Sequence, residues 1–429
     1  MRNPETVDEI LTFGRDSGGY ARRQVVDLVS TARNGFEGGF VRIAIVSADD
    51  LDGDDPRELS AALAARGQDV TACVRRAGRQ PAETRAGGYH TLAVSVGPQE
   101  ETSAAEVMPY VGEWAATLER IWSSNRPDVV HAYGWLGGLA AQLAARRLNL
   151  PTVQTFQGLA AQRGQGPPEL ERMRIEPLLA RSASWVTGES AADVDVLTRL
   201  RHGRTCVSVL TCGVDVERYA PTGPALPRTD FHRIVCLAPN PLPDNGFDIV
   251  ISTLPGVPGA EVVIAETEAG NRDHDAARTA LRRQAVELGV ADRVRFAGTV
   301  SDEELPKLLR SADVVACTPR RPPRATAVLQ AMASGVVVIA LPVGVLTDAV
   351  VDDVTGFLLP ADNARGLAAT LRSVLNQRFQ CESMGAAGRG RALSRFAWDR
   401  IALDALNIYR QVAEERSASP PNLQSARAQ

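Results

Sequence analysis

Residues 295–360 read RFAGTVSDEELPKLLRSADVVACTP (295–319), RRPPRATAVLQ (320–330) and AMASGVVVIALPVGVLTDAVVDDVTGFLLP (331–360). Short apolar runs rich in valine and isoleucine, which are typical of buried parallel strands, occupy 294–298, 313–318, 336–341 and 356–360. Between them, the segments 302–312 and 325–335 repeat apolar residues at helical spacing. This alternation predicts a parallel sheet covered by helices on both faces.

The same alternation extends towards both ends of the chain. It begins at Val41 and restarts near His232, after the proline-rich stretch APTGPALPRTD at 220–230. In the first series, a helix should begin at Asp55-Pro56, because aspartate caps a helix and proline suits its first turn. We therefore expect two doubly wound, Rossmann-like halves, with ligands bound beyond the carboxyl ends of the strands, in a cleft between them.

Length and charge exclude some classes of function. The 429 residues suggest two domains, and 44% hydrophobic with 23% charged residues is ordinary for a globular protein. The net charge of −4 argues against a nucleic-acid surface, so we expect no nucleic-acid partner. Lys307 is the only lysine among 47 basic residues, so contacts to anions would come from arginines, backbone amides or helix ends.

Cysteines and apolar runs indicate the compartment. The six cysteines lack a paired CxxC spacing and mostly lie in strand-like runs, which favours buried free thiols in a reducing cytosol. The N-terminus shows no signal peptide, and the apolar run at 335–346 is too short to span a bilayer. We expect a cytoplasmic protein without a transmembrane segment.

Several motifs resemble the nucleotide-sugar glycosyltransferases of family 4, and they follow one another in the order of that family. Besides 295–360, they are PDVVHAYGWLGGLAAQLAARR (127–147), TFQGL (155–159), ARSASWVTGES (180–190) and VLTCGVDVERYAP (209–221). The resemblance covers about 40–415. It implies the GT-B fold, which is two Rossmann-like domains facing across a cleft, and retaining transfer of a sugar from a nucleotide sugar without a metal.

The resemblance also implies a division of the chain. The segments would be a helical N-terminal extension (1–39), an acceptor-side domain (40–218), a linker (219–231), a donor-side domain (232–394), a helix crossing back to the first domain (395–416) and a disordered tail (417–429). The role of the extension is not indicated by the sequence.

This chain departs from the family at polar positions of the donor site. The family's two glutamates correspond to Pro322 and Gln330, its loop lysine to Asn245, its loop arginine to Pro239 or Asn240, its loop glycine near 325 to Ala325, and two histidines to Tyr133 and Gln157. Loss of cations and carboxylates together predicts a degenerate site, because charge stabilisation and sugar orientation fail as a unit.

The remaining site candidates are few. Weak catalytic candidates are His131, at the end of a strand, and Gln330, whose amide oxygen could still accept a ribose hydroxyl. A local packing role for His131 is the alternative. Candidates for binding the donor nucleotide sugar are Gly246, Asn245, Phe296, Thr326, Gln330, Arg320, Arg321 and Arg324.

Two charged loops have open interpretations. Arg320, Arg321 and Arg324 are either substitute phosphate ligands or a solvated basic loop, and we favour the second. The loop SADDLDGDD at 47–55 offers carboxylates to a divalent cation, yet it lacks the glutamate that completes a calcium loop. A solvated loop whose last aspartate, Asp55, caps a helix is the simpler interpretation, and we expect no metal and no cofactor other than a nucleotide sugar.

Three functions fit these residues. The first is a glycosyltransferase-like protein whose activity on a nucleotide sugar and an unknown acceptor is weak or lost. The second is a non-catalytic homologue that acts as a binding, regulatory or scaffolding partner of an active glycosyltransferase. The third is an enzyme that binds another phosphorylated ligand through the arginines of the 320–324 loop.

Overall fold

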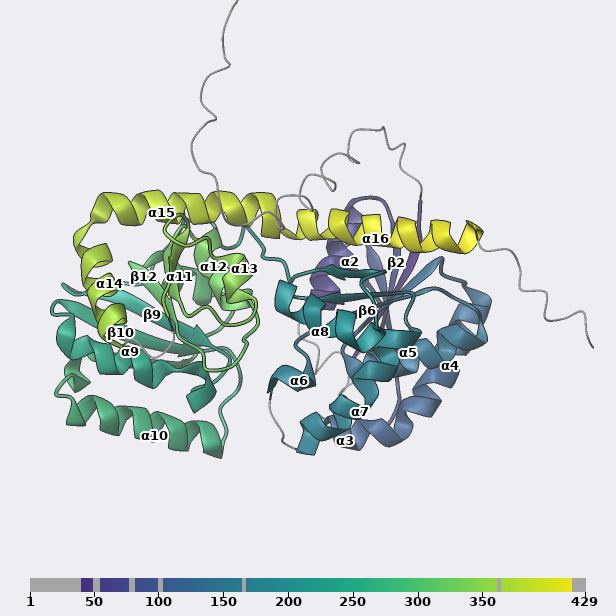
Figure 1. Ribbon diagram of the computed structural model, residues 1–429, viewed down its shortest axis with the longest axis horizontal. Helices are drawn as coiled ribbons and strands as arrows, with labels where there is room; N and C mark the ends of the chain where they lie inside the picture. Colours follow the sequence, from purple (N-terminus) through teal and green to yellow (C-terminus); the bar gives the residue numbers. More distant parts are fainter. Residues whose placement is uncertain are drawn as a thin grey trace, which may run out of the picture. The chain divides into compact units, whose positions relative to one another are not determined.

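A computed structural model describes residues 40–48, 55–76, 82–98, 103–163, 167–360 and 364–418. Residues from Val41 onward form one compact unit that contains two parallel-sheet α/β domains (Figure 1). The predicted extension at 1–39, the aspartates at 49–54 and residues 419–429 of the predicted tail (417–429) lie outside the described residues. Residues 417 and 418 belong to the last helix and not to a tail.

The first domain is built on an eight-stranded sheet in the order β3-β4-β2-β1-β5-β6-β7-β8. Its strands are β1 (Arg42–Ser47), β2 (Asp69–Arg75), β3 (Glu83–Ala86), β4 (Tyr89–Val94), β5 (Val129–Tyr133), β6 (Thr152–Phe156), β7 (Trp185–Gly188) and β8 (Val207–Val209). Its helices are α2 (Asp55–Ala65), α3 (Ala104–Val107), α4 (Val111–Ser124), α5 (Trp135–Arg147), α6 (Ala160–Arg163), α7 (Pro167–Ser182) and α8 (Ala191–Arg201).

Two local features of this domain differ from the expected pattern. The edge strand β3 pairs antiparallel with β4 through a turn at Gly87 and Gly88, both at positive φ. Its four residues are exposed or half-buried and carry no apolar alternation, so hydrophobic periodicity could not find it. The helical stretch from 104 to 124 is interrupted at Pro109 by a 3₁₀ turn, Met108–Tyr110, because proline cannot donate its backbone N–H to a continuing helix.

The second domain has a six-stranded, fully parallel sheet in the order β11-β10-β9-β12-β13-β14. The strands are β9 (His232–Ala238), β10 (Ala260–Glu266), β11 (Val294–Thr299), β12 (Val314–Cys317), β13 (Val337–Ala340) and β14 (Gly356–Leu358). The helices are α9 (Phe247–Thr253), α10 (Arg272–Glu287), α11 (Leu305–Arg310), α12 (Thr326–Ala333), α13 (Leu346–Ala349), α14 (Ala364–Asn376) and α15 (Arg378–Arg391).

Buried apolar residues cover both faces of each sheet. Along β1, Ile43 and Ile45 belong to one core cluster and Ala44 and Val46 to another, because successive side chains of a strand point to opposite faces. This arrangement explains why the strands read as continuous apolar runs rather than as alternating ones.

The last helix, α16 (Trp398–Ala418), belongs to the core of the first domain although it follows the second in sequence. Ile401, Ala405 and Tyr409 are buried in the same cluster as Ile43 and Ile45. In Figure 1 this helix (yellow) lies beside α2. A π-helical turn, Ala392–Phe396, joins it to α15.

The order of each sheet reverses at one point. In the first sheet β1 lies between β2 and β5, and in the second β9 lies between β10 and β12. Doubly wound sheets bind ligands beyond the carboxyl ends of the strands at such reversals. A ligand site is therefore expected beside the residues that follow β1, β5, β9 and β12.

Candidate functional site

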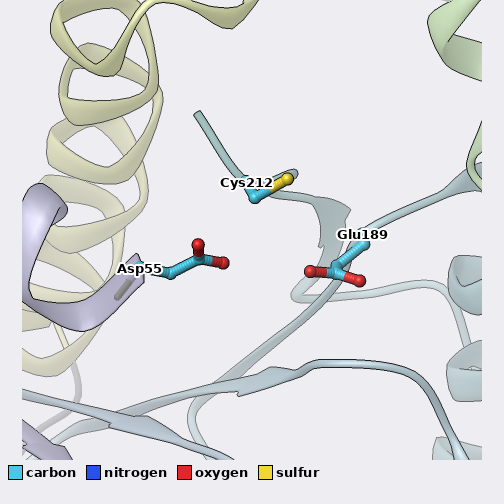
Figure 2. Close-up of side chains that lie close together, drawn as sticks. All are labelled: Asp55, Glu189 and Cys212. Atoms are coloured by element: carbon cyan, nitrogen blue, oxygen red, sulfur yellow. The ribbon is translucent and has the colours of Figure 1, made fainter. Parts of the chain in front are cut away.

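Side chains from both domains meet at these strand ends in a group that we call the Arg324 cluster, made of Asp55, Glu189, Cys212 and Arg324. Figure 2 shows the carboxylates of Asp55 and Glu189 facing each other, with Cys212 beside them. One ligand atom of each of these three residues lies within 4.8 Å of those of the other two. Arg324 Nη2 lies 3.3 Å from Glu189 Oε1 and also donates to Asp55 Oδ2. The cluster is thus an ion triad beside a thiol.

Each member occupies the end of a strand or the start of a helix. Asp55 is the first residue of α2, which follows β1, and Glu189 comes directly after β7. Cys212 follows β8, and Arg324 lies in the loop between β12 and α12. Asp55, Glu189 and Cys212 meet because the carboxyl ends of parallel strands share one edge of the first sheet, and Arg324 reaches them from the second sheet, 269 positions from Asp55.

Burial strengthens the electrostatics of the triad. The side chains of Glu189, Asp55 and Arg324 are 5%, 13% and 26% exposed, so solvent screens their attraction weakly. Burial alone would lower the pKa of Arg324, but the charges of Glu189 and Asp55 outweigh it and raise that pKa. The guanidinium therefore stays protonated.

Asp55, Glu189 and Cys212 also form a potential set of metal ligands. Two carboxylates and a thiol could ligate an ion, but Arg324 already binds both carboxylates as an internal cation. Burial, with the charges of Asp55 and Glu189, raises the pKa of Cys212 above its ordinary value, so the thiol keeps its proton. A metal ion would have to displace Arg324 and deprotonate Cys212.

Gln157 and Tyr133 lie beside this cluster. Gln157 Nε2 donates to Asp55 Oδ2 over 3.4 Å. Tyr133, the last residue of β5, is buried, and burial, followed by the charges of Tyr409, Asp55 and Glu189, raises its pKa well above the ordinary value. Both side chains thus adjoin the ion triad.

In the second domain, the loop after β9 is held by amide hydrogen bonds. Asn245 Nδ2 donates to the backbone oxygen and to Oδ1 of Asn240, both over 2.9 Å. Asn240 Nδ2 in turn donates to Glu268 Oε2 over 2.9 Å. Asn240 and Asn245 therefore bind each other, and Asn240 also binds a carboxylate of the same domain.

Gly246 has a conformational role in this loop. Its φ is +70°, and a Cβ placed on it would lie 1.7 Å from the carbonyl oxygen of Thr318. Thr318 Oγ1 also donates to the Gly246 carbonyl over 2.8 Å. A bulky substitution at 246 would therefore disrupt the loop itself and would not test nucleotide binding cleanly.

The other predicted donor positions are separated by the structure. Gln330 Nε2 donates to the Tyr219 hydroxyl over 3.0 Å, and Phe296 packs beneath the guanidinium of Arg282, 4.8 Å from its ring centre. Thr326, the first residue of α12, lies 4.0 Å from Cys212 Sγ through its hydroxyl. Of these three, only Thr326 borders the Arg324 cluster.

The three arginines of the 320–324 loop have different partners. Arg320 makes a two-pronged contact with Asp248 at 2.7 and 2.6 Å, and Arg321 pairs with Asp244 at 3.3 Å. Both pairs lie within the second domain and are largely exposed. Arg324 instead reaches Asp55 and Glu189 in the first domain, so the three arginines do not form one anion site.

His131 lies in a buried hydrogen-bonded chain. Its Nδ1 is 2.6 Å from the Tyr409 hydroxyl on α16, and its Nε2 is 2.6 Å from Thr155 Oγ1, which is 2.6 Å from Thr187 Oγ1. Burial lowers the pKa of His131 to about 3, so the ring is neutral. These contacts favour the packing alternative for His131, since they attach α16 to the first sheet.

Sequence reasoning gave no role to Glu189 or Cys212 and treated Asp55 as a helix cap. A signal for Glu189 was present, because the carboxylate directly follows an apolar strand that ends in Thr187-Gly188. No signal indicated that Arg324 would be its partner.

Comparisons with known proteins identify the family and the fold of the chain. Residues 55–213 match the family "Glycosyl transferase 4-like domain", and residues 240–391 match "Glycosyl transferases group 1". The chain belongs to the GT4-type glycosyltransferases. A relative, D-inositol 3-phosphate glycosyltransferase from Jonesia denitrificans, is 29% identical over 82% of this chain and 89% of its own.

The chain shares the GT-B fold with solved structures. Sucrose-phosphate synthase from Thermosynechococcus elongatus covers 87% of this chain and all of its own at 21% identity, with a TM-score of 0.76. Anabaena HepE, solved with UDP and glucose, covers 88% of this chain and all of its own at 17% identity, with a TM-score of 0.66. Among the described residues, no helix is long and apolar enough to cross a membrane.

Proposed function

We propose that this GT4-type protein receives a nucleotide sugar in its cleft but transfers the sugar weakly or not at all. The supporting observation is that polar side chains at the predicted donor positions bind the protein itself. Gln330 donates to Tyr219, Asn245 donates to Asn240, and Arg324 binds carboxylates of the first domain.

The energetic reason concerns the leaving group. A nucleotide diphosphate develops negative charge in the transition state, which cations or amides must meet. At the positions that the resemblance aligns with the family's lysine and arginine, this chain has Asn245 and either Pro239 or Asn240, none of which carries a positive charge. Losing a single oxyanion donor costs an enzyme about 2.7–4 kcal/mol of transition-state stabilisation, so losing two such groups would slow transfer severely.

Binding of the nucleotide is proposed on the basis of the scaffold. The nucleotide would lie between the end of β11 and the start of α12, where the amides of Thr326 and its neighbours are oriented to meet a phosphate. The relative solved with UDP and glucose supports this choice of ligand class. The acceptor and the sugar remain open in this proposal.

The alternative is a non-catalytic homologue that binds or regulates an active glycosyltransferase. The same self-contained hydrogen bonds favour it, because they leave the donor positions satisfied without a ligand. For either function we propose a cytoplasmic location, which is supported by the six cysteines, all of them free thiols.

Calorimetric titration with UDP, GDP, ADP and their sugars, together with assays of hydrolysis and transfer, tests the proposal. We expect binding of at least one nucleotide and turnover well below about 1 s⁻¹, the lower end of the ordinary enzyme range. Turnover at or above that rate would refute the proposal of a weak enzyme. Silence across the whole panel would favour the partner function.

A rebuilt site supplies the matched comparison. Asn245→Lys, Pro322→Glu and Gln330→Glu together restore the family's residues at three positions. Because such groups act as a unit, each single substitution should recover little and the combination more. Equal activity of the triple variant and the unmodified chain would show that these positions do not limit the rate.

A further inference from the structure

Two charged side chains of the second domain, Arg324 and Asp348, contact residues of the first domain. One contact is that of Arg324 with Asp55 and Glu189. The other is made by Asp348 on α13, whose Oδ2 accepts the backbone N–H of Ala191 over 2.7 Å. Since Ala191 begins α8 two residues after Glu189, both contacts converge on the segment between β7 and α8.

Each contact has a sound electrostatic basis. The N-terminus of α8 carries the positive end of the helix dipole, which favours a carboxylate such as that of Asp348 at the Ala191 N–H. Arg324 carries one positive charge against the two carboxylates of Asp55 and Glu189, which holds its guanidinium firmly on the first domain.

These contacts lie where a ligand of the second domain should enter. Arg324 lies in the loop after β12, and Asp348 follows β13. The crevice beyond β9 and β12 is the ligand position of a doubly wound sheet. A ligand that needs this crevice therefore competes with contacts that bring the two domains together over it.

The energetics allow such a contact to open. For a buried ion pair, the cost of desolvation largely offsets the Coulomb attraction, so exposing all partners to water together costs little. Removing one partner while the others stay buried costs much more. The closed arrangement is thus specific, and it can still be reversed.

We propose that Asp55, Glu189, Arg324 and Asp348 form an interdomain lock, which holds the two domains together in the ligand-free chain and restricts entry of an anionic ligand. The lock concerns the conformation of the chain and does not require the proposed function to be correct. Only its effect on nucleotide affinity rests on that proposed function.

The test uses the full chain with Asp55→Asn and Glu189→Gln, which keep side-chain size and leave Arg324 in place. The control is Glu119→Gln with Asp128→Asn. It removes the same charge from carboxylates that pair with Arg147 and Arg42 inside the first domain. Small-angle scattering gives the radius of gyration, and hydrogen exchange reports the amide of Ala191.

We expect the lock variant to have a larger radius of gyration and to exchange the Ala191 amide on the order of tenfold faster, while the control matches the unmodified chain. UDP should bind the lock variant on the order of tenfold more tightly, within the usual range of coupling between sites. Dimensions and exchange equal to those of the control would overturn the lock.

The readouts separate the two proposals. Opening without nucleotide binding by any variant would support the lock and count against the proposed donor site. If the lock variant fails to fold, Arg324→Gln removes the cation instead, and the same exchange and scattering measurements decide. Unchanged exchange at Ala191 in that variant would again overturn the lock.

Discussion

Lowering the pH from 7 to 5 should destabilise the first domain by about 2 kcal/mol through His131 alone. Burial lowers the pKa of this residue to about 3 from an ordinary value of 6.5. Between these values the unfolded chain binds a proton that the folded chain does not, so stability falls as the pH falls. The stability that the neutral His131 ring contributes is fully present above about pH 6.5 and is lost progressively as the pH falls towards 3.

The magnitude follows from the two pKa values. At pH 7 the ring is mostly neutral in both states, whereas at pH 5 it is charged in nearly all unfolded molecules and neutral in the folded ones. The factor by which proton binding to His131 favours the unfolded chain over the folded chain rises about 25-fold between pH 7 and pH 5. This corresponds to about 2 kcal/mol of lost stability.

Tryptophan fluorescence can follow this effect in one domain. All five tryptophans lie in the first domain or in α16, namely Trp114, Trp122, Trp135, Trp185 and Trp398. Urea unfolding at pH 7 and pH 5 would be compared between the unmodified chain and His131→Gln, so that other titrating groups cancel. An equal loss of stability in both proteins, within about 0.5 kcal/mol, would refute a neutral, buried His131.

Two further predictions concern stability. Gly246→Ala should cost about 1–3 kcal/mol more folding stability than Gly259→Ala, because both positions have positive φ but only Gly246 places a Cβ against the Thr318 carbonyl. Thermal unfolding followed by circular dichroism measures both losses, and equal shifts of the melting temperature would contradict the steric argument. Arg324→Met should cost more than Arg320→Met. Leaving the carboxylates of Asp55 and Glu189 without a cation costs up to about 3–5 kcal/mol while the domains stay closed, and opening of the domains reduces this loss by solvating both carboxylates. Arg320→Met, at an exposed pair, should cost about 0–1 kcal/mol, and equal losses by urea unfolding would contradict a buried triad.

Much of the fold could be predicted from local sequence. Apolar runs and helical spacing, which are properties of neighbouring residues, predicted the two parallel α/β domains and the restart of the pattern near His232. Strand β3 escaped prediction because its exposed edge residues need no apolar pattern. The interruption of the helical stretch at Pro109 has a local cause, because proline cannot donate a backbone hydrogen bond within a helix.

The site was predictable only in part, because it is made by contacts between distant residues. Sequence pointed to the 320–324 loop, but it could not distinguish Arg320, which pairs inside its own domain, from Arg324, which crosses to the other. Asp55, Glu189 and Arg324 come together because each follows a strand whose carboxyl end faces the same crevice. Hydrophobic periodicity determines which segments become strands, whereas the path of the chain through both sheets decides which charges meet.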